Sequence, residues 1–378
     1  MRIIHVVTLV SPDGAYGGPV RVAMNQLREL ARLGHEVELV AGSRGFGPRP
    51  PTELEGIPVR LFEVSQLVPH GGYAGLVAPG LSRYIKSRFS DLDLVHVHLA
   101  RDLITMPVAQ LVSKSDVPLF AQTHGMIVEP RNLQGRLFDL FIGRKVLHGA
   151  RTVFVLTRAE SESLTAVAGP ALHLESIANG VPMPAEVPPS VSPVNVLFLA
   201  RLHARKRPVI FVEMAKQLVD EGFDATFSIV GPNEGEAPAV ESLIRRHGLS
   251  HRIAFEGALA PEETLNRIAA CGIYVLPSVG EVFPMSVLEA MSVGRPVVIT
   301  TSNGLAEPLA AAGAALVADE TLESLVDATR SLLADAELRA ILSRRARAEV
   351  ALHYSIESVA QQLVQAYTRV TRDPRNYS

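Results

Sequence analysis

The chain has 378 residues, too many for one ordinary hydrophobic core, and this length predicts two domains of roughly 150–200 residues each. Hydrophobic residues make up 47% and charged residues 20%, a balance that is typical of globular proteins and excludes a disordered chain. The formal net charge of −3 argues against nucleic-acid binding, and the single cysteine, Cys271, excludes a disulfide framework and a cysteine-rich metal site.

The first half of the chain alternates short apolar runs with longer helical patterns. The opening run is short and ends in a turn after Val10, so we interpret it as a buried strand rather than a signal peptide. A helical pattern over 20–33 follows and ends at Gly34, a residue suited to a helix C-terminus. We predict strands at 3–9, 36–42, 59–64, 94–99, 118–124, 152–157 and 174–179.

The second half repeats this scheme, and beyond Asp335 the pattern is helical to the end. The proline-rich segment Val181–Val194 has the composition of a linker and separates the halves. Apolar strands that are joined by helices indicate parallel sheets covered on both faces. We therefore predict an α/β protein with two doubly wound Rossmann-like domains, 1–185 and 186–354, that face each other across a ligand-binding cleft. The second-half strands are expected at 196–201, 226–231, 253–257, 273–277, 296–301 and 314–318.

The stretch GEVFPMSVLEAMSVGRPVVIT contains two carboxylates, Glu281 and Glu289. Its pattern predicts a strand, a loop, a helix over Pro284–Val293 and a further strand, with Gly294 as the C-terminal cap. The start of such a helix offers unpaired N–H groups, which form a natural site for a diphosphate. We expect these N–H groups at Met285, Ser286 and Val287.

Carboxylates repel phosphates, but they are good acceptors for the hydroxyl groups of sugars. The pattern therefore predicts a nucleotide-sugar site, with the diphosphate at the helix start and the diols held by Glu281 and Glu289. The alternative is a loop carboxylate beside a first-turn carboxylate that complements the helix dipole.

A basic loop follows the strand at 196–201. Arg201 at the strand end and Lys206 across a tight turn are able to converge on phosphate oxygens and to neutralise a departing nucleoside diphosphate. The alternative is a solvated basic loop, an interpretation that suits the neighbouring Arg205 and Arg207 better.

Two further features lie at strand ends. Gly17 and Gly18 follow the first strand and allow close approach of a ligand to the backbone, although such pairs are also common in plain turns. His124 ends the strand at 118–124, where its ring is placed to contact a sugar or phosphate. His96 and His98 share one face of a strand and lack further metal ligands, so we interpret them as structural.

These motifs together resemble the retaining GT-B glycosyltransferases of family 4, also described as glycosyl transferases group 1. The resemblance covers nearly the whole chain, and its specific part is the E-x7-E pattern that starts at Glu281. The chain departs from the family pattern at Ala200 and Asn303, where glycine is common. The matching segments are GG at 17–18, THG at 123–125, NGV at 179–181, ARLHARK at 200–206 and EVFPMSVLE at 281–289.

The resemblance implies a role for each matching residue. Glu281 would hold the transferred sugar, Glu289 the ribose, and the Arg201–Lys206 pair the diphosphate. His124 would contact the donor, and a final helix over about 355–372 would pack back on the first domain. Further donor-binding residues implied are Gly17, Gly18, Phe283, Pro284, Met285, Ser286 and Val287.

We therefore expect a retaining enzyme that moves a hexose-type sugar from a UDP- or GDP-sugar to a hydroxyl of a glycan or lipid-linked acceptor in surface polysaccharide synthesis. No metal or other cofactor is required on this account, and attack from the front side of the sugar is implied by the resemblance. The alternatives are a sugar-nucleotide epimerase, a transferase with a small-molecule acceptor, and a non-catalytic nucleotide-sugar binding module.

The expected location is cytoplasmic, because cysteine is scarce and no apolar run approaches the roughly 20 residues of a membrane span. A basic amphipathic helix near 133–149 suggests peripheral contact with the inner surface of the membrane. Packing of that helix on its own domain, with a solvated basic face, is the alternative.

Overall fold

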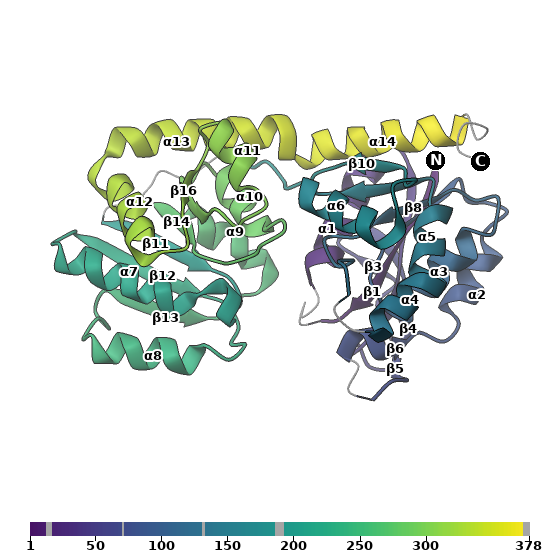
Figure 1. Cartoon of the computed structure of the whole chain (residues 1–378), viewed down its shortest axis with the longest axis horizontal. Helices are drawn as coiled ribbons and strands as arrows, with labels where there is room; N and C mark the ends of the chain where they lie inside the picture. Colours follow the sequence, from purple (N-terminus) through teal and green to yellow (C-terminus); the bar gives the residue numbers. More distant parts are fainter. Residues whose placement is uncertain (13–16, 70–71, 131–132, 186–192, 373–378) are drawn as a thin grey trace. The chain divides into compact units, whose positions relative to one another are not determined.

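The computed structural model describes residues 1–12, 17–69, 72–130, 133–185 and 193–372 (Figure 1). The chain divides into two compact units. Unit 1 comprises Met1–Gly180 and Ile356–Ser378, and unit 2 comprises Val181–Ser355. The division after Gly180 lies slightly before the predicted boundary at 185/186, and residues 186–192 of the predicted linker lie outside the described residues.

Unit 1 is built on a sheet with the strand order β10-β9-β8-β7-β1-β2-β4-β3, in which only the short β3 pairs antiparallel. The chain passes from β1 outward through β2 and β4 and then returns to β7 on the other side of β1. The topological switch point of unit 1 therefore lies between β1 and β7. The strands are β1 (Arg2–Val10), β2 (Glu36–Ser43), β3 (Glu53–Leu54), β4 (Ile57–Glu63), β7 (Leu94–His98), β8 (Leu119–Gln122), β9 (Thr152–Val155) and β10 (Leu174–Ser176), and a separate pair is formed by β5 (Ser65–Gln66) and β6 (Leu76–Val77).

Helices cover both faces of this sheet because its strands are apolar on both sides (Figure 1). They are α1 (Gly17–Arg32), η1 (Gly72–Gly75), α2 (Leu81–Ser87), α3 (Thr105–Val112), α4 (Leu133–Phe138), η2 (Asp139–Gly143), α5 (Arg144–Gly149), α6 (Arg158–Ala168) and α14 (Ile356–Arg372).

Unit 2 has a fully parallel sheet with the order β13-β12-β11-β14-β15-β16. The order reverses between β11 and β14, so the switch point of unit 2 lies there. The strands are β11 (Val194–Leu199), β12 (Ala225–Val230), β13 (Ile253–Gly257), β14 (Ile273–Leu276), β15 (Val297–Thr300) and β16 (Leu316–Ala318). The helices are η3 (Ala204–Lys206), α7 (Pro208–Asp220), α8 (Ala237–Arg246), α9 (Pro261–Ala269), α10 (Met285–Ser292), α11 (Ala306–Ala311), α12 (Leu322–Ala334), α13 (Ala336–Glu349) and η4 (Val350–Tyr354).

The predicted fold class is confirmed, since both units are doubly wound α/β structures with parallel sheets. Each predicted strand overlaps a strand of the structure. The sequence does not predict β3, β5 and β6, because two residues are too few to show a period.

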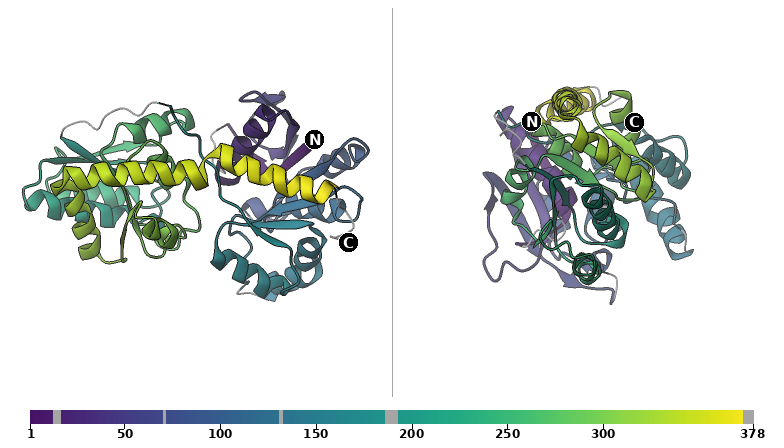
Figure 2. Two further views of the ribbon diagram at one scale, coloured as in Figure 1. Left: turned by 90° about the horizontal axis from the view of Figure 1, so that it is seen from above. Right: turned by 90° about the vertical axis from the view of Figure 1, so that its left-hand side faces the viewer.

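The C-terminal helix α14 packs on unit 1 (yellow in Figure 2). Val359, Leu363 and Tyr367 are fully buried in a cluster that includes Phe120 and Phe154 of the sheet. The ring centroids of Tyr367 and Phe120 lie 4.7 Å apart in an edge-to-face arrangement, which is favourable for aromatic pairs. The last helix of the chain is therefore part of the core of unit 1.

Candidate active site

The loops that follow β11 and β14 carry the acidic and basic residues predicted for unit 2. In open α/β sheets, ligands bind outside the carboxyl ends of the strands at the switch point, which is where these two loops begin. The first loop runs through η3, and the second leads into α10, which is labelled in Figure 1.

Glu281 and Lys206 form an ion pair, with 2.8 Å between Lys206 Nζ and Glu281 Oε2. Both side chains are mostly enclosed, with exposed fractions of 12% for Glu281 and 16% for Lys206. Arg205 joins them, since its guanidinium donates to the carbonyl of Gly280 at 2.8 Å and lies 3.5 Å from Glu281 Oε1. The structure therefore brings the predicted loop carboxylate and the predicted cation together.

Arg201 and Arg207 both bind partners within unit 2. Arg201 is exposed and pairs with Glu234, at 2.7 and 3.0 Å from the two carboxylate oxygens. The interpretation of Arg207 as a solvated cation is wrong, because its guanidinium donates to the carbonyl groups of Pro277 and Glu320 and the residue is half-buried. Arg207 thus fastens the basic loop to the end of β14.

Gly231 follows β12 and lies against the start of the basic loop. Its φ is 147°, and a Cβ atom at this position would lie 1.9 Å from the carbonyl oxygen of Ala200. Only glycine fits there, so the backbones after β11 and β12 approach each other closely.

Helix α10 begins one residue later than predicted, with Pro284 as its N-cap residue. Within the described part of the chain, the backbone N–H groups of Met285 and Ser286 donate to no acceptor. The prediction of an unpaired N–H at Val287 is wrong, because this group donates to the Pro284 carbonyl at 3.2 Å in a tight first turn. The helix start therefore offers two backbone donors to a ligand rather than three. At the other end, Gly294 has a φ of 66° and caps the helix as predicted.

Tyr274 of β14 supports the first turn of α10. Its hydroxyl donates to the carbonyl of Leu199 at 2.9 Å and lies 2.8 Å from Ser286 Oγ, so the serine hydroxyl donates to the tyrosine. Burial raises the pKa of Tyr274, and the charges of Glu289 and Glu281 raise it further. The tyrosine therefore stays protonated and links β11, β14 and α10.

Glu289 lies in the second turn of α10 and is buried, with 3% of its surface exposed. The alternative of a first-turn carboxylate is wrong, since α10 has no acidic residue in its first turn. A charged side chain is rarely buried without a structural or binding function, so Glu289 stays a candidate binding residue of the site.

In unit 1, His124 lies in a turn directly after β8. Both His124 and Gly125 have left-handed backbone conformations, with φ of 52° and 71°. Burial lowers the pKa of His124 to about 3, so the ring is neutral. Its Nε2 atom lies 2.7 Å from Nδ1 of His98, which is buried at the end of β7.

Glu160 of α6 holds this turn through hydrogen bonds to its carboxylate. Its Oε1 atom accepts hydrogen bonds from the hydroxyl of Thr123 and from the N–H of Gly125 at 2.5 Å, on either side of His124. Its Oε2 atom accepts from the N–H of Leu156 at 2.7 Å. Sequence analysis missed Glu160, since its position three residues after Thr157 reads as an ordinary capping box.

The glycine pair of the first loop begins α1, so it is helical rather than part of a loop. Gly18 has open space where a Cβ atom would lie, so packing does not demand glycine there. Within the described residues, no group of three or more His, Cys, Asp or Glu side chains is arranged to hold a metal ion.

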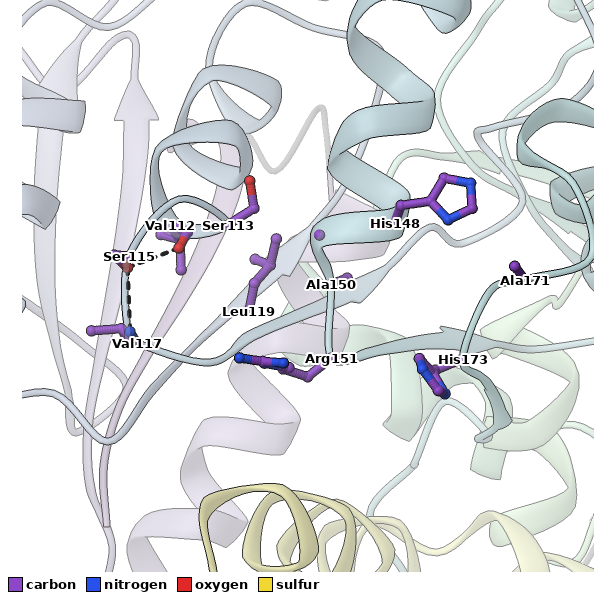
Figure 3. Close-up of a pocket in the computed structure, with 11 residues that line it drawn as sticks. Val112, Ser113, Ser115, Val117, Leu119, His148, Ala150, Arg151, Ala171 and His173 are labelled. Atoms are coloured by element: carbon purple, nitrogen blue, oxygen red, sulfur yellow. Dashed lines mark hydrogen bonds between the residues drawn. The ribbon is translucent and has the colours of Figure 1, made fainter. Parts of the chain in front are cut away.

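A pocket of about 350 Å³ lies elsewhere in unit 1 (Figure 3). It is lined by Val117 and Leu119 at the start of β8, by Arg151 before β9 and by the His148 ring of α5. These are the amino ends of the strands, the opposite edge from His124, so we do not assign the pocket to the site.

Comparison with known proteins agrees with the fold and the family predicted from the motifs. A family model described as glycosyl transferases group 1 matches residues 193–335, and one described as a glycosyl transferase 4-like domain matches residues 17–180. The chain belongs to the group 1 glycosyltransferases. The family predicted from the motifs is thereby confirmed.

Relatives of this group 1 glycosyltransferase include a D-inositol 3-phosphate glycosyltransferase of Corynebacterium urealyticum, 29% identical over 234 residues, or 60% of this chain and 53% of that protein. The N,N'-diacetylbacillosaminyl-diphospho-undecaprenol alpha-1,3-N-acetylgalactosaminyltransferase of Campylobacter jejuni is 33% identical over 180 residues, or 47% of this chain and 45% of that protein. The chain thus matches about half the length of these curated relatives.

A solved structure shares the fold of the whole chain. Anabaena Alr3699/HepE, crystallised with UDP and glucose, has a TM-score of 0.75 and 18% identity, covering 98% of this chain and 100% of that one. None of the helices in the described residues of this glycosyltransferase is long and apolar enough to cross a membrane.

Proposed function

We propose that the protein is a retaining glycosyltransferase that moves a hexose-type sugar from a UDP- or GDP-sugar to a hydroxyl of a glycan or lipid-linked acceptor. The observation that carries this proposal is the Lys206–Glu281 pair at the switch point of unit 2. It combines a cation for the diphosphate with a carboxylate for sugar hydroxyls, next to the donors of Met285 and Ser286.

The pair has capacity left for a ligand. A lysine ammonium has three donors and Lys206 uses one of them on Glu281, so it is able to hold a phosphate oxygen at the same time. Arg201 is exposed beside the loop and is able to move from Glu234 to the diphosphate, where its fork would bind two oxygens. Glu289 would hold the ribose hydroxyls. No metal or other cofactor enters this proposal.

The chemical step needs stabilisation of the departing nucleoside diphosphate, which Lys206, Arg201 and the start of α10 supply. We propose front-side attack by the acceptor hydroxyl, with the departing phosphate taking the hydroxyl proton, so that the configuration of the sugar is retained. His124 would accept a hydrogen bond from a hydroxyl of the substrate. The HepE structure contains UDP and glucose, which supports a UDP-sugar as the first donor to try.

The first experiment mixes the purified protein with UDP- and GDP-hexoses, with and without glycan or lipid-linked acceptors, and follows free nucleotide and the sugar product. We expect nucleotide release that depends on an acceptor, and an anomeric configuration, read by NMR, that matches the donor. An altered sugar that is still attached to its nucleotide would identify an epimerase instead. Donor binding without turnover under every condition would identify a binding module.

A second part of the proposal concerns the location of the acceptor. An apolar patch on unit 1 consists of the exposed residues Val128, Leu133, Leu137, Leu140 and Phe141. The exposed fractions of Leu133 and Phe141 are 71% and 61%. Arg136 and Lys145 are exposed on the same run of helix, so the surface is both apolar and basic.

Hydrogen bonds from Arg101 hold the segments that carry the patch. Arg101 binds the buried carboxylate of Asp139 through two nitrogens, at 2.9 and 2.7 Å, and also donates to the carbonyl of Val128 at 2.6 Å. We propose that this apolar patch rests on an anionic membrane surface that carries a lipid-linked acceptor, such as the diphospho-undecaprenol named for the Campylobacter relative.

Flotation with vesicles tests this part. We expect binding to vesicles of phosphatidylcholine that contain phosphatidylglycerol, and weaker binding to phosphatidylcholine alone. The double variant Leu133→Asp/Phe141→Asp should lose most binding, while Leu67→Asp, at a residue of unit 1 that is 64% exposed outside the patch, should not. Equal binding by both variants would refute membrane contact through the patch.

A further inference from the structure

A buried chain of hydrogen-bonding rings leads from His124 into the core of unit 1. His124 Nε2 lies 2.7 Å from His98 Nδ1, and His98 Nε2 lies 3.1 Å from His5 Nδ1. His5 Nε2 lies 3.4 Å from the hydroxyl of Tyr367, which lies 2.5 Å from His96 Nδ1. The strands β1 and β7, the turn after β8 and the final helix α14 thus contribute to one connected chain.

The rings beyond His124 are enclosed, with exposed fractions of 1% or less for His5, His96, His98 and Tyr367. Burial lowers the pKa of His5 to about 3 and holds the pKa of His96 and His98 well below the usual value. Each imidazole is therefore neutral and carries its proton on one nitrogen only.

If the Tyr367 hydroxyl both donates and accepts, a chain of neutral rings has two consistent arrangements, because each contact needs one donor and one acceptor. In the first, His124 donates through Nε2 to His98, His98 to His5, His5 to the Tyr367 oxygen, and the Tyr367 hydroxyl to His96. In the second, every contact is reversed. The proton on His124 is then on Nε2 in the first arrangement and on Nδ1 in the second.

Two observations favour the first arrangement. The Tyr367 hydroxyl has one proton to donate, and hydrogen bonds donated by a hydroxyl are shorter than those donated by N–H. Its contact with His96 Nδ1 at 2.5 Å is much shorter than its contact with His5 Nε2 at 3.4 Å, so the hydroxyl donates to His96. In addition, the first arrangement places the proton of all four histidines on Nε2, the tautomer that free imidazole side chains prefer in water. The second requires the less stable tautomer four times.

The first arrangement leaves Nδ1 of His124 as a lone pair, and no hydrogen bond from the described residues reaches this atom. His124 is also the member of the chain that is partly exposed. We propose that His98, His5 and Tyr367 are positioning residues that hold the proton of His124 on Nε2, so that Nδ1 accepts a hydrogen bond from a substrate hydroxyl. This inference rests on the proposed transferase function for its consequence, but not for the state of the rings.

NMR of the free protein tests the ring state directly. With ¹⁵N-labelled histidine, two-bond ¹H–¹⁵N correlations should show an unprotonated Nδ1 and a protonated Nε2 for His124, His98, His5 and His96. A protonated Nδ1 on His124 would overturn the proposal. Since this measurement needs no substrate, it separates the failure of the relay from the failure of the proposed function.

Kinetics of two variants at one position test the consequence. His98→Leu removes the acceptor for His124, while His98→Asn places an amide oxygen near the position of Nδ1 and so keeps it. We expect His98→Leu to lower kcat about three- to tenfold with little change in the donor KM, and His98→Asn to restore most of the activity. A merely structural role would make both variants equally poor, and this result, or full activity of a folded His98→Leu protein, would overturn the proposal.

Discussion

Replacement of Glu160 by glutamine changes one group of α6 that binds the turn carrying His124. The carboxylate uses both oxygens: Oε1 accepts from Thr123 and Gly125, and Oε2 accepts from the N–H of Leu156. Glutamine has the same shape but a single acceptor oxygen. Whichever way its amide is turned, at least one buried donor faces the amide NH₂ group instead of an acceptor.

The cost follows from the contacts. Hydrogen bonds to a charged group contribute more than neutral ones, and a buried donor without a partner costs about 1–3 kcal/mol. Glu160→Gln should therefore lower the free energy of unfolding by about 2–4 kcal/mol. Urea unfolding followed by far-UV circular dichroism measures this value, which suits a chain that contains no tryptophan.

Glu162 provides the control on the same helix. Its carboxylate is 65% exposed and pairs with Arg158 at 2.9 Å, so Glu162→Gln should change the free energy of unfolding by less than about 0.5 kcal/mol. Hydrogen exchange should also show faster exchange at Gly125 and Leu156 in Glu160→Gln. If both variants unfold at the same urea concentration, the buried carboxylate does not hold the turn and the reasoning is refuted.

Three further predictions concern unit 2. Lys206→Ala should lower the rate of nucleotide release about 100-fold, while the control Lys216→Ala, which removes an exposed pair with Asp220, should leave this rate unchanged. Equal rates for the two variants in a transfer assay would contradict the proposed site. Gly231→Ala should lower the free energy of unfolding by about 2–4 kcal/mol, because its Cβ atom would overlap the Ala200 carbonyl, and calorimetry measures the change. Burial raises the pKa of the Cys271 thiol to about 12, so iodoacetamide at neutral pH should label this cysteine only in the unfolded protein. Mass spectrometry measures the labelling, and rapid labelling of the native protein would show that Cys271 is not buried.

Apart from the two-residue β3, the strands of both sheets could be predicted because each is a short apolar run between helical patterns. The E-x7-E segment likewise shows its loop, helix and capping glycine in the residue types alone. The first turn of α10 could not be predicted in detail. Whether the N–H of Val287 bonds to Pro284 depends on a local backbone geometry that the residue types leave open.

Contacts between distant segments were also beyond the sequence. Arg201 and Glu234 are far apart in the chain and meet because β11 and β12 are neighbours, with Gly231 allowing the close approach. His96 and His98 share a strand face as expected, but their link to Tyr367 of α14 requires knowledge of where the last helix packs. A single sequence contains no signal for these pairings.

The acceptor capacity of two carboxylates separates a supporting residue from a binding one. Glu160 of unit 1 is buried and receives three short hydrogen bonds from fixed protein donors, so little capacity is left for a ligand. Glu281 of unit 2 has one close partner, Lys206, and a distant one in Arg205 at 3.5 Å. Since a carboxylate has about four acceptor positions, Glu281 keeps room for the hydroxyls of a sugar. The same residue type thus fixes a backbone turn in unit 1, whereas at the switch point of unit 2 it has acceptor positions left for a ligand.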